Sequence, residues 1–498
     1  VVHAEYERYI REKEPGGDSL QFFKERFPEE FSKIKNFVSC FPVSKLEKYP
    51  DSFSELKSVI EKNEGQIYFI GHHRAHAANA FFSSNFDKSI ILTIDGGGVE
   101  TDRNDITSFG IWEGKDNRVE PLGIFPIHQV NIGGVWTRST RYIFNLQSGW
   151  PRGHQAGTVM AMAAMGDPEK YKDDFIKMLT DDLQYAYHKP PGQPPGANVG
   201  TDPDHPYLHK WRKIADKSEQ DKFDLAAGLQ SATETYLKDI FDQTLSQLPE
   251  HVNICLSGGV VLNSVFTGKL FDWYGDRIKG IYVTPTPHDG GLPLGAAQYV
   301  YHQLLGNPRV KWEDHAPVYL GEHYDDQAVN SAINNASDKI TTRKTSMDEV
   351  VNLLDNQKIV SVFSGGSESG RRALGNRSIL ADPRSPDMKD MINEKVKHRQ
   401  WFRPFAPSIL AEDTKDWFER DVESPYMSFV VKFKEEVRDK VPAVVHFDGT
   451  ARLQTVTENN NPFYYKLLKK WKKKSGVPII LNTSFNDREP ICETPDHA

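Results

Sequence analysis

Short apolar segments repeatedly end in polar or glycine-rich turns along the first two thirds of this chain. The β-rich segments 66–70, 89–94, 252–256 and 280–285 each run into such a turn, and helix-like sequence follows several of them. Apolar runs of this length that are bounded by glycine are typical of buried strands. The repeated order of strand, turn and helix predicts an α/β fold with its chemistry placed where strands end.

Two of these strand ends carry candidate metal ligands. His72 and His76 follow one strand in an Ala-rich segment, and in a helix their Cβ atoms would lie roughly 5–6 Å apart on one face. Asp95 ends the next strand, and Asp289 lies in the turn after 280–285. Taken alone, a histidine pair is more often a packing feature and a DGGG sequence more often a turn. Together they predict a His2Asp2 site, whose mixed nitrogen and oxygen ligands suit iron, manganese or zinc.

Glycines at the same strand ends suggest that an anion approaches the backbone there. Gly96, Gly97 and Gly98 follow Asp95, and Gly258 and Gly259 lie before Asn263. Backbone N–H groups without side chains beside them can approach a phosphate closely. Each glycine pair alone could be a tight turn between a strand and a helix. Because they share this location with the candidate ligands, we expect a cofactor cleft.

The last third of the chain contains many cations among glycines, prolines and aromatic residues. Guanidinium groups in such a setting are typical of a pocket that binds phosphate or carboxylate. Taken one by one, about half of these arginines are equally well explained as structural ion pairs. The candidate cations are Arg372, Lys397, Arg403, Arg452 and Arg488.

Length and composition limit the remaining classes. A chain of 498 residues is too long for one core. We place the main domain boundary between residues 345 and 346 and expect an irregular Pro/Gly-rich loop at 189–206. There is no apolar run of about 18 residues and no recognisable signal peptide, so we expect no membrane segment. Three widely separated cysteines argue against a disulfide framework and favour the cytoplasm.

Several longer motifs resemble one family, the NodU/CmcH O-carbamoyltransferases. In the first part of the chain these are GHHRAHAANAFF (71–82), DGGG (95–98), LSGGVVLNS (256–264) and D-x-G-x-x-LGAA (289–297). In the second part they are RALGNRSILADPR (372–384), K-x-R-x-x-FRPFAP (397–407), DGTARxQ (448–454) and NTSFN (482–486). The resemblance implies an actin-like ATPase domain with an internal duplication over 1–345 and a smaller YrdC-like α/β domain over 346–498.

The resemblance also implies a reaction and assigns roles to residues. The YrdC-like domain would use carbamoyl phosphate and ATP, with Mg²⁺ for the ATP, to make carbamoyl-adenylate on the five cations, helped by Asn482 and Ser484. The first domain would bind the AMP part on the glycines and Asn263, and iron on the His2Asp2 set. Val1 aligns near the end of the family's N-terminal hairpin, so we expect a trimmed chain and name no general base. We also expect that a homodimer can form.

The acceptor hydroxyl is the least defined part of this interpretation. A small-molecule hydroxyl is the default. The basic run from Lys466 to Lys474 would favour a hydroxymethylated base in DNA, although such a run is more often a solvated helix face. Two other classes stay open: a sugar or metabolite kinase, which would transfer the γ-phosphate of ATP, and a nucleotide-binding scaffold without catalysis.

Overall fold

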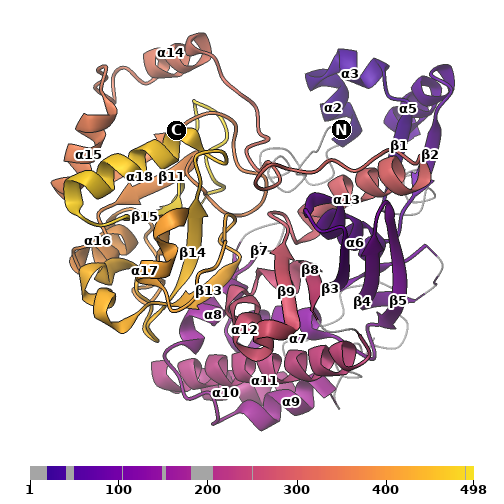
Figure 1. The fold of residues 1–498 in the computed structure, drawn as a ribbon, viewed down its shortest axis with the longest axis horizontal. Helices are drawn as coiled ribbons and strands as arrows, with labels where there is room; N and C mark the ends of the chain where they lie inside the picture. The colour runs from indigo at the N-terminus through magenta and orange to yellow at the C-terminus, as the bar shows by residue number, and fades with distance from the viewer. Residues whose placement is uncertain are drawn as a thin grey trace. The chain divides into compact units, whose positions relative to one another are not determined.

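The structure is a computed structural model that describes residues 19–40, 50–101, 103, 105–148, 153–180, 206–248, 251–487 and 489–498 (Figure 1). The chain divides into two compact units. The first comprises residues 1–159, 168–262 and 276–311, and the second comprises 160–167, 263–275 and 312–498. The expected loop at 189–206 lies outside the described residues except for Pro206. The domain boundary at 345/346 stays a prediction.

The first unit contains a five-stranded mixed sheet in the order β5-β4-β3-β8-β9. Strands β3, β8 and β9 are parallel neighbours, whereas β4 and β5 continue the sheet from β3 as an antiparallel meander. A separate parallel pair is formed by β1 and β2, and a short antiparallel pair by β6 and β7. The strands are β1 (Asn36–Ser39), β2 (Gln66–Phe69), β3 (Lys88–Val99), β4 (Ile106–Lys115), β5 (Arg118–Pro126), β6 (Gln147–Ser148), β7 (Gly153–His154), β8 (Val252–Ser257) and β9 (Ile278–Val283).

Helices surround this sheet, and the one that carries the candidate ligands, α6, packs directly on it. The Ala-rich sequence of α6 favours a helix, and Ala77, Phe81 and Ala75 are fully buried against Ile91 of β3 and Trp112 of β4. The α-helices that lie wholly or partly in the first unit are α2 (Ser19–Arg26), α3 (Pro28–Ser32), α5 (Pro50–Lys62), α6 (His72–Ser83), α7 (Ile132–Arg138), α8 (Ala156–Ala163), α9 (Lys172–Thr180), α10 (Pro206–Ala215), α11 (Glu219–Ser246) and α13 (Leu292–Gln298).

The second unit is built on a six-stranded sheet in the order β10-β11-β15-β12-β14-β13. All neighbours are antiparallel except β12 and β14. Its strands are β10 (Val360–Phe363), β11 (Arg377–Ala381), β12 (Ala406–Leu410), β13 (Phe429–Lys432), β14 (Thr450–Val456) and β15 (Ile479–Ser484). Its α-helices are α12 (Ser264–Tyr274), α14 (Asp326–Asn335), α15 (Met347–Asp355), α16 (Asp387–Lys395), α17 (Thr414–Trp417) and α18 (Pro462–Ser475).

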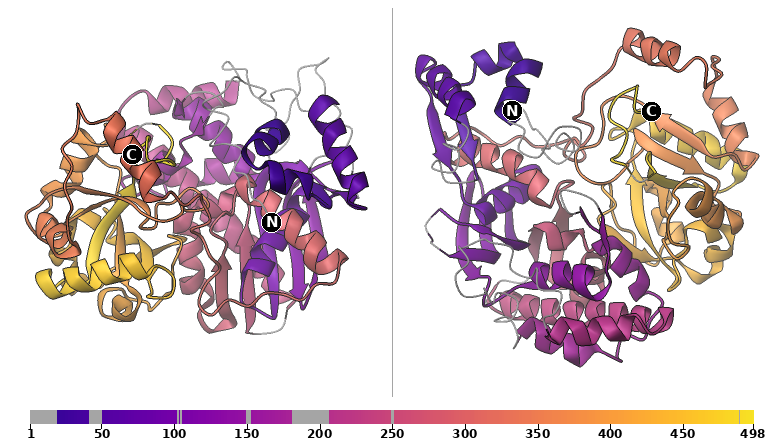
Figure 2. Two further views of the ribbon diagram at one scale, coloured as in Figure 1. Left: turned by 90° about the horizontal axis from the view of Figure 1, so that it is seen from above. Right: turned by 180° about the vertical axis from the view of Figure 1, so that it is seen from behind.

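One face of this second sheet is apolar at one end and polar at the other. Leu380, Ile480 and Val456 pack in one core with helices α15 and α18. On the same face, the strand register places Gln454 beside Ser408, and Asn482 beside Leu380. Because side chains alternate along a strand, Arg452 shares this face with Gln454. The α/β class expected from the sequence is confirmed in both units, and Figure 2 shows their strands and surrounding helices from two further sides.

Candidate functional site

Four side chains of the first unit meet at the start of α6, beside residue 95 of β3 and the turn that follows β9. Among the described residues, His72, His76, Asp95 and Asp289 form a group whose donor atoms all lie within 4.8 Å of one another. The Nε2 atom of His76 is 3.0 Å from Oδ2 of Asp95 and 3.5 Å from Oδ1 of Asp289. The Nε2 atom of His72 is 3.7 Å from each of these oxygens. The structure therefore brings the predicted His2Asp2 set together.

Neighbouring groups orient the most buried members of this set. The backbone N–H of Gly259 donates to Oδ2 of Asp95 at 3.0 Å, and that of Gly96 donates to Oδ1. The Oγ atom of Ser257 lies 3.1 Å from Nδ1 of His76 and 3.2 Å from the carbonyl oxygen of Pro287. The Ser257 hydroxyl donates its proton to the carbonyl oxygen of Pro287, so its oxygen accepts a hydrogen bond from Nδ1–H of His76. This leaves Nε2 of His76 to face the carboxylates.

The chemistry of this set fits a metal ion. The Nε2 atoms of His72 and His76 are both buried and face the same two carboxylate oxygens at 3.0–3.7 Å. Burial opposes a charge on His76, but Asp289 and Asp95 outweigh it and raise its pKa to about 9. Burial likewise opposes the charge on Asp95, but His72 and His76 hold its pKa well below its usual range. Two imidazoles and two carboxylates suit a divalent transition metal.

Glu100 is a residue of this region that the sequence did not indicate. It is 2% exposed, and its Oε1 accepts hydrogen bonds from the backbone N–H groups of His73 and Arg74, the latter at 3.2 Å. A carboxylate at this place satisfies unpaired donors of the first helical turn and opposes the helix dipole. Glu100 thus fixes the start of α6, from which His72 and His76 project. Its position five residues after Asp95 carries no recognisable signal.

The sequence predicted that the strand ends before Asp95 in a glycine-rich turn. In the structure, β3 continues through these glycines to Val99. Ile94 pairs with Phe109 and Gly98 with Thr107, so residues 95–97 form a bulge opposite a single residue. Gly97 has φ = +135° and Gly258 has φ = +101°, both in the region that favours glycine. Asn263 accepts from the backbone N–H of Phe266 at 3.2 Å and caps α12. A cofactor-binding role for these residues stays a prediction.

Gly98 and Gly96 offer a matched test of the histidine site. A Cβ on Gly98 would lie 2.0 Å from Cγ of His72, whereas a Cβ on Gly96 would meet nothing within 4 Å. We expect Gly98→Ala to displace His72 and weaken metal binding by about 10–100-fold, the usual effect of disturbing groups that hold a ligand in place. Gly96→Ala should bind metal like the wild type. Titration with Fe²⁺, Mn²⁺ or Zn²⁺ measures both, and equal affinities of the two variants would contradict this role of Gly98.

Several of the predicted cations gather in the second unit. Arg372, Arg403 and Arg452 are half-buried, and Nε of Arg452 has no hydrogen-bond partner. Burial, and then the charges of Arg403 and Arg399, lower the pKa of Arg452 to about 10. Burial, then Arg452, Arg371 and Arg403, hold the pKa of Arg372 well below its usual range. Because arginine stays charged in proteins, these shifts indicate that the guanidinium groups are partly removed from water and repel one another.

Lys397 contributes differently from the arginines. It is 4% exposed, and burial followed by the charge of Arg399 lowers its pKa to about 7. Its ammonium group lies within hydrogen-bond distance of the carbonyl oxygens of Ser484 and Asn486, of Oγ of Ser484 at 3.2 Å and of Oδ1 of Asn486 at 2.9 Å. These acceptors outnumber its three protons. In this structure Lys397 therefore holds the segment after β15, and Arg488 lies outside the described residues.

Buried polar side chains support the cationic region. Asn482 donates through Nδ2 to Gln454 at 2.9 Å and to the carbonyl oxygen of Ala373 at 3.1 Å. The Oε1 atom of Glu368 accepts from the backbone N–H groups of Leu374, Asn376 and Arg377 at 2.7, 2.9 and 3.2 Å. Glu368 therefore shapes the loop that carries Arg372. Arg377 is fully buried, donates to Ser364 and Gly365 carbonyl oxygens and lies 3.6 Å from the Phe363 ring centroid, so it is structural.

Three of the six lysines in the basic run of α18 pair with carboxylates of their own unit. Lys470 lies 2.5 Å from Asp348, Lys472 lies 2.7 Å from Asp413, and Lys474 lies 3.6 Å from Asp355. The opposite face of the helix, with Leu467, Leu468 and Trp471, is buried against the sheet. The run is therefore the polar face of an amphipathic helix, and it supplies little argument for a DNA acceptor.

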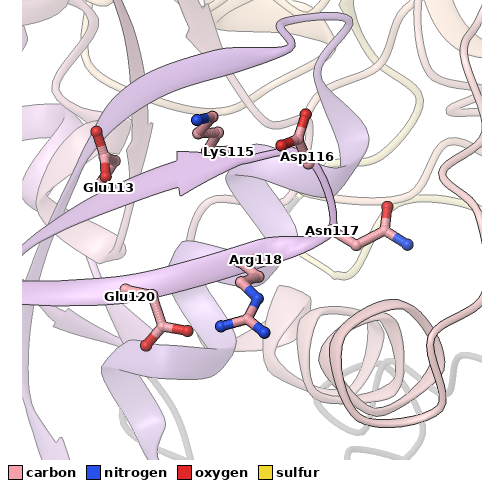
Figure 3. A pocket seen from close by; sticks show the side chains of 6 residues that line it. All are labelled: Glu113, Lys115, Asp116, Asn117, Arg118 and Glu120. Carbon is pink, nitrogen blue, oxygen red and sulfur yellow. The ribbon is translucent and has the colours of Figure 1, made fainter.

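A depression of about 350 Å³ lies at the turn between β4 and β5 (Figure 3). None of the predicted site residues lines it. Its side chains carry both signs of charge, so it offers no field of one sign to a charged ligand. They are Glu113, Lys115, Asp116, Asn117, Arg118 and Glu120.

Two family models match this chain, one in its first part and one in its last part. The family described as carbamoyltransferase N-terminus matches residues 29–298, and the one described as carbamoyltransferase C-terminus matches residues 351–498. The chain therefore belongs to the carbamoyltransferase family, and its reaction class is carbamoyl transfer.

Named relatives cover most of this chain. It is 35% identical over 450 residues to nodulation protein NolNO of Sinorhizobium fredii, covering 87% of this chain and 61% of that protein. It is 35% identical over 444 residues to nodulation protein NolO of Bradyrhizobium diazoefficiens, covering 86% and 75%. Among solved structures, full-length HypF in its phosphate- and nucleotide-bound form has a TM-score of 0.29 at 15% identity, covering 53% of this chain and 41% of that one. No helix in the described part has the length and apolarity to cross a membrane.

Proposed function

We propose that the protein is an ATP-dependent O-carbamoyltransferase that makes carbamoyl-adenylate and transfers its carbamoyl group to a hydroxyl. The observation that carries this proposal is the group of crowded guanidinium ions in the second unit. Burial is the largest cause of the lowered pKa of Arg452 and Arg372, and the charges of other arginines lower it further. A cluster with this imbalance is suited to a polyanion such as ATP together with carbamoyl phosphate.

The first half-reaction follows from the balance of atoms. Release of both phosphate and pyrophosphate requires water to cleave carbamoyl phosphate into carbamate and phosphate. A carbamate oxygen then attacks the α-phosphorus of ATP, and the bond to the β-phosphate breaks to release pyrophosphate. Arg372, Arg403 and Arg452 would bind the phosphates and stabilise the charge on the leaving pyrophosphate. Lys397 would keep Ser484 and Asn486 in place beside them.

The second half-reaction uses the His2Asp2 set of the first unit. An acceptor hydroxyl attacks the carbonyl carbon, the bond to AMP breaks, and the hydroxyl proton passes to a base. A divalent metal ion, which we propose is iron, on His72, His76, Asp95 and Asp289 would supply Lewis-acid polarisation. The Ser257 hydroxyl accepts a hydrogen bond from Nδ1–H of His76 and so keeps the proton on that nitrogen. The backbone N–H groups of Gly96 and Gly259 donate to the Asp95 carboxylate and hold it in place. A small-molecule hydroxyl is the proposed acceptor.

Product analysis tests this function against a kinase. With carbamoyl phosphate and Mg·ATP, we expect phosphate and pyrophosphate to form in equal amounts, and pyrophosphate formation to stop when carbamoyl phosphate is omitted. A kinase would form ADP without any need for carbamoyl phosphate, and a scaffold would form neither product. Formation of ADP, or of no pyrophosphate under any condition, would refute the proposal. Mass spectrometry of offered hydroxyl compounds, including hydroxymethylated DNA, would identify the acceptor by a gain of one carbamoyl group.

A further inference from the structure

Two aromatic rings stand exposed beside the cationic region of the second unit. Trp401 is 48% exposed and Phe447 is 65% exposed, the highest value for a large apolar side chain among the described residues. Their ring centroids are 6.3 Å apart and their planes are inclined at 69°. They come from segments 46 residues apart in sequence, so the fold brings them together. Neighbouring exposed rings of this kind are typical of a binding surface.

The backbone of Trp401 is held by the same residue that orients a cation. Asn393, which is 2% exposed, donates through Nδ2 to the carbonyl oxygens of Trp401 and Arg403 at 3.3 and 3.0 Å. Its Oδ1 accepts from Nε of Arg399 at 2.7 Å. The charge of Arg399 in turn acts on Arg452. Trp401 is therefore fixed with respect to the arginine cluster.

Phe447 is also linked to cations of the second unit. It lies in a tight turn in which the backbone N–H of Gly449 donates to His446 at 2.9 Å and that of His446 donates to Thr450 at 2.8 Å. This turn leads directly into β14, which carries Arg452. The ammonium group of Lys389 lies 5.9 Å from the Phe447 ring centroid. Burial lowers the pKa of His446 to about 4, the charge of Asp448 opposes this, and the charges of Arg452 and Lys389 add to it.

We propose that Trp401 and Phe447 form the stacking surface for the purine base of ATP, whose phosphates bind the arginine cluster. This inference rests on the proposed function and names the group that selects a nucleotide over a simple polyphosphate. A base cannot fit between rings whose centroids are 6.3 Å apart and whose planes are inclined, so it stacks on an outer face. Aromatic rings stack with bases of any sequence, and the adjacent cations provide the matching charge for the triphosphate.

Binding of a ligand with and without a base tests this inference. Calorimetry would measure Mg·ATP and inorganic tripolyphosphate with wild type, Trp401→Ala, Phe447→Ala and the control Phe463→Ala, which removes another exposed ring of the same unit. We expect the first two variants to bind Mg·ATP about 5–100-fold more weakly, the usual range for one lost stacking contact. Tripolyphosphate affinity should not change, and Phe463→Ala should match the wild type.

The outcomes separate this inference from the proposed function. Unchanged Mg·ATP affinity in both ring variants would overturn the stacking surface while leaving the carbamoyltransferase proposal intact. An equal loss of Mg·ATP and tripolyphosphate would also overturn it, since the rings would then shape the phosphate pocket. Weaker binding of a single-stranded oligonucleotide with unchanged Mg·ATP binding would assign the rings to nucleic acid instead. A wild type that binds neither Mg·ATP nor tripolyphosphate would refute the proposed function itself.

Discussion

Replacing His76 by alanine is expected to remove metal binding and carbamoyl transfer to the acceptor while leaving pyrophosphate release intact. His76 is fully buried, and its Nε2 faces Asp95 and Asp289 at 3.0 and 3.5 Å. Loss of one ligand should lower metal affinity by more than about 100-fold, because disturbing only the groups around a ligand already costs about 10–100-fold. Metal content by elemental analysis and separate assays of the two half-reactions measure these effects.

His73→Ala is the matched control for this experiment. Like His76, His73 is a fully buried imidazole on α6. Its Nδ1 lies 2.9 Å from Oγ1 of Thr93, and burial lowers its pKa to about 3. Both variants lose similar packing, so both should unfold at a lower temperature than the wild type. Only His73→Ala should still gain thermal stability from added metal, as expected for a ligand that binds the native state. A metal-dependent gain in His76→Ala would contradict the site.

Replacing Arg452 by alanine is expected to have the largest effect on the first half-reaction. Its guanidinium group is half-buried among other arginines, and its Nε has no hydrogen-bond partner. Removing one charged donor from a site that stabilises developing charge typically lowers the rate by about 10²–10³-fold. Pyrophosphate release should therefore fall by this factor. Transfer from chemically prepared carbamoyl-adenylate to an acceptor should remain.

The thermal stability of the ligand-free Arg452→Ala protein tests whether the arginines of the cluster repel one another. Because Arg403 and Arg399 repel Arg452, the ligand-free Arg452→Ala protein should be no less stable than the wild type. Functional sites often gain stability in this way when a residue needed for activity is removed. Arg420→Ala is the control, since Arg420 is exposed and pairs with Asp272 at 2.7 Å. It should leave the rate unchanged. A clear loss of stability in Arg452→Ala with a normal rate would show that Arg452 is structural.

Local patterns predicted much of the first unit's site. The spacing of His72 and His76 places both on one face of α6, because the helical repeat brings positions i and i+4 together. Parallel neighbours bring their carboxyl ends to one edge of a sheet, so the proximity of Asp95 and Asp289 could be expected from β3, β8 and β9. The approach of His72 and His76 could not, because β2, which leads into α6, pairs with β1 in a separate sheet. The bulge at residues 95–97 could not, because it depends on how β3 and β4 pair.

The second unit was harder to interpret from sequence, since arginines in one motif have opposite roles. Arg372 and Arg377 both belong to the segment RALGNRSILADPR, yet Arg377 binds backbone carbonyl oxygens and Arg372 lies in the cation cluster. Lys397 lies among oxygen atoms of Ser484 and Asn486, and its contact with phosphate stays a prediction. Which partner a long cationic side chain reaches depends on distant segments of the fold.

The amino-acid sequence by itself determined the α/β class, the family and the four candidate metal ligands, because periodicity, turn residues and short motifs are local properties of the chain. Only the tertiary structure decided which neighbouring residues contact and orient the functional side chains. Glu100 at the start of α6, Ser257 beside His76, and the pairing of Trp401 with Phe447 all join segments that are far apart in sequence. Such contacts arise when strands and helices pack, and no local pattern encodes which distant side chain will complete them.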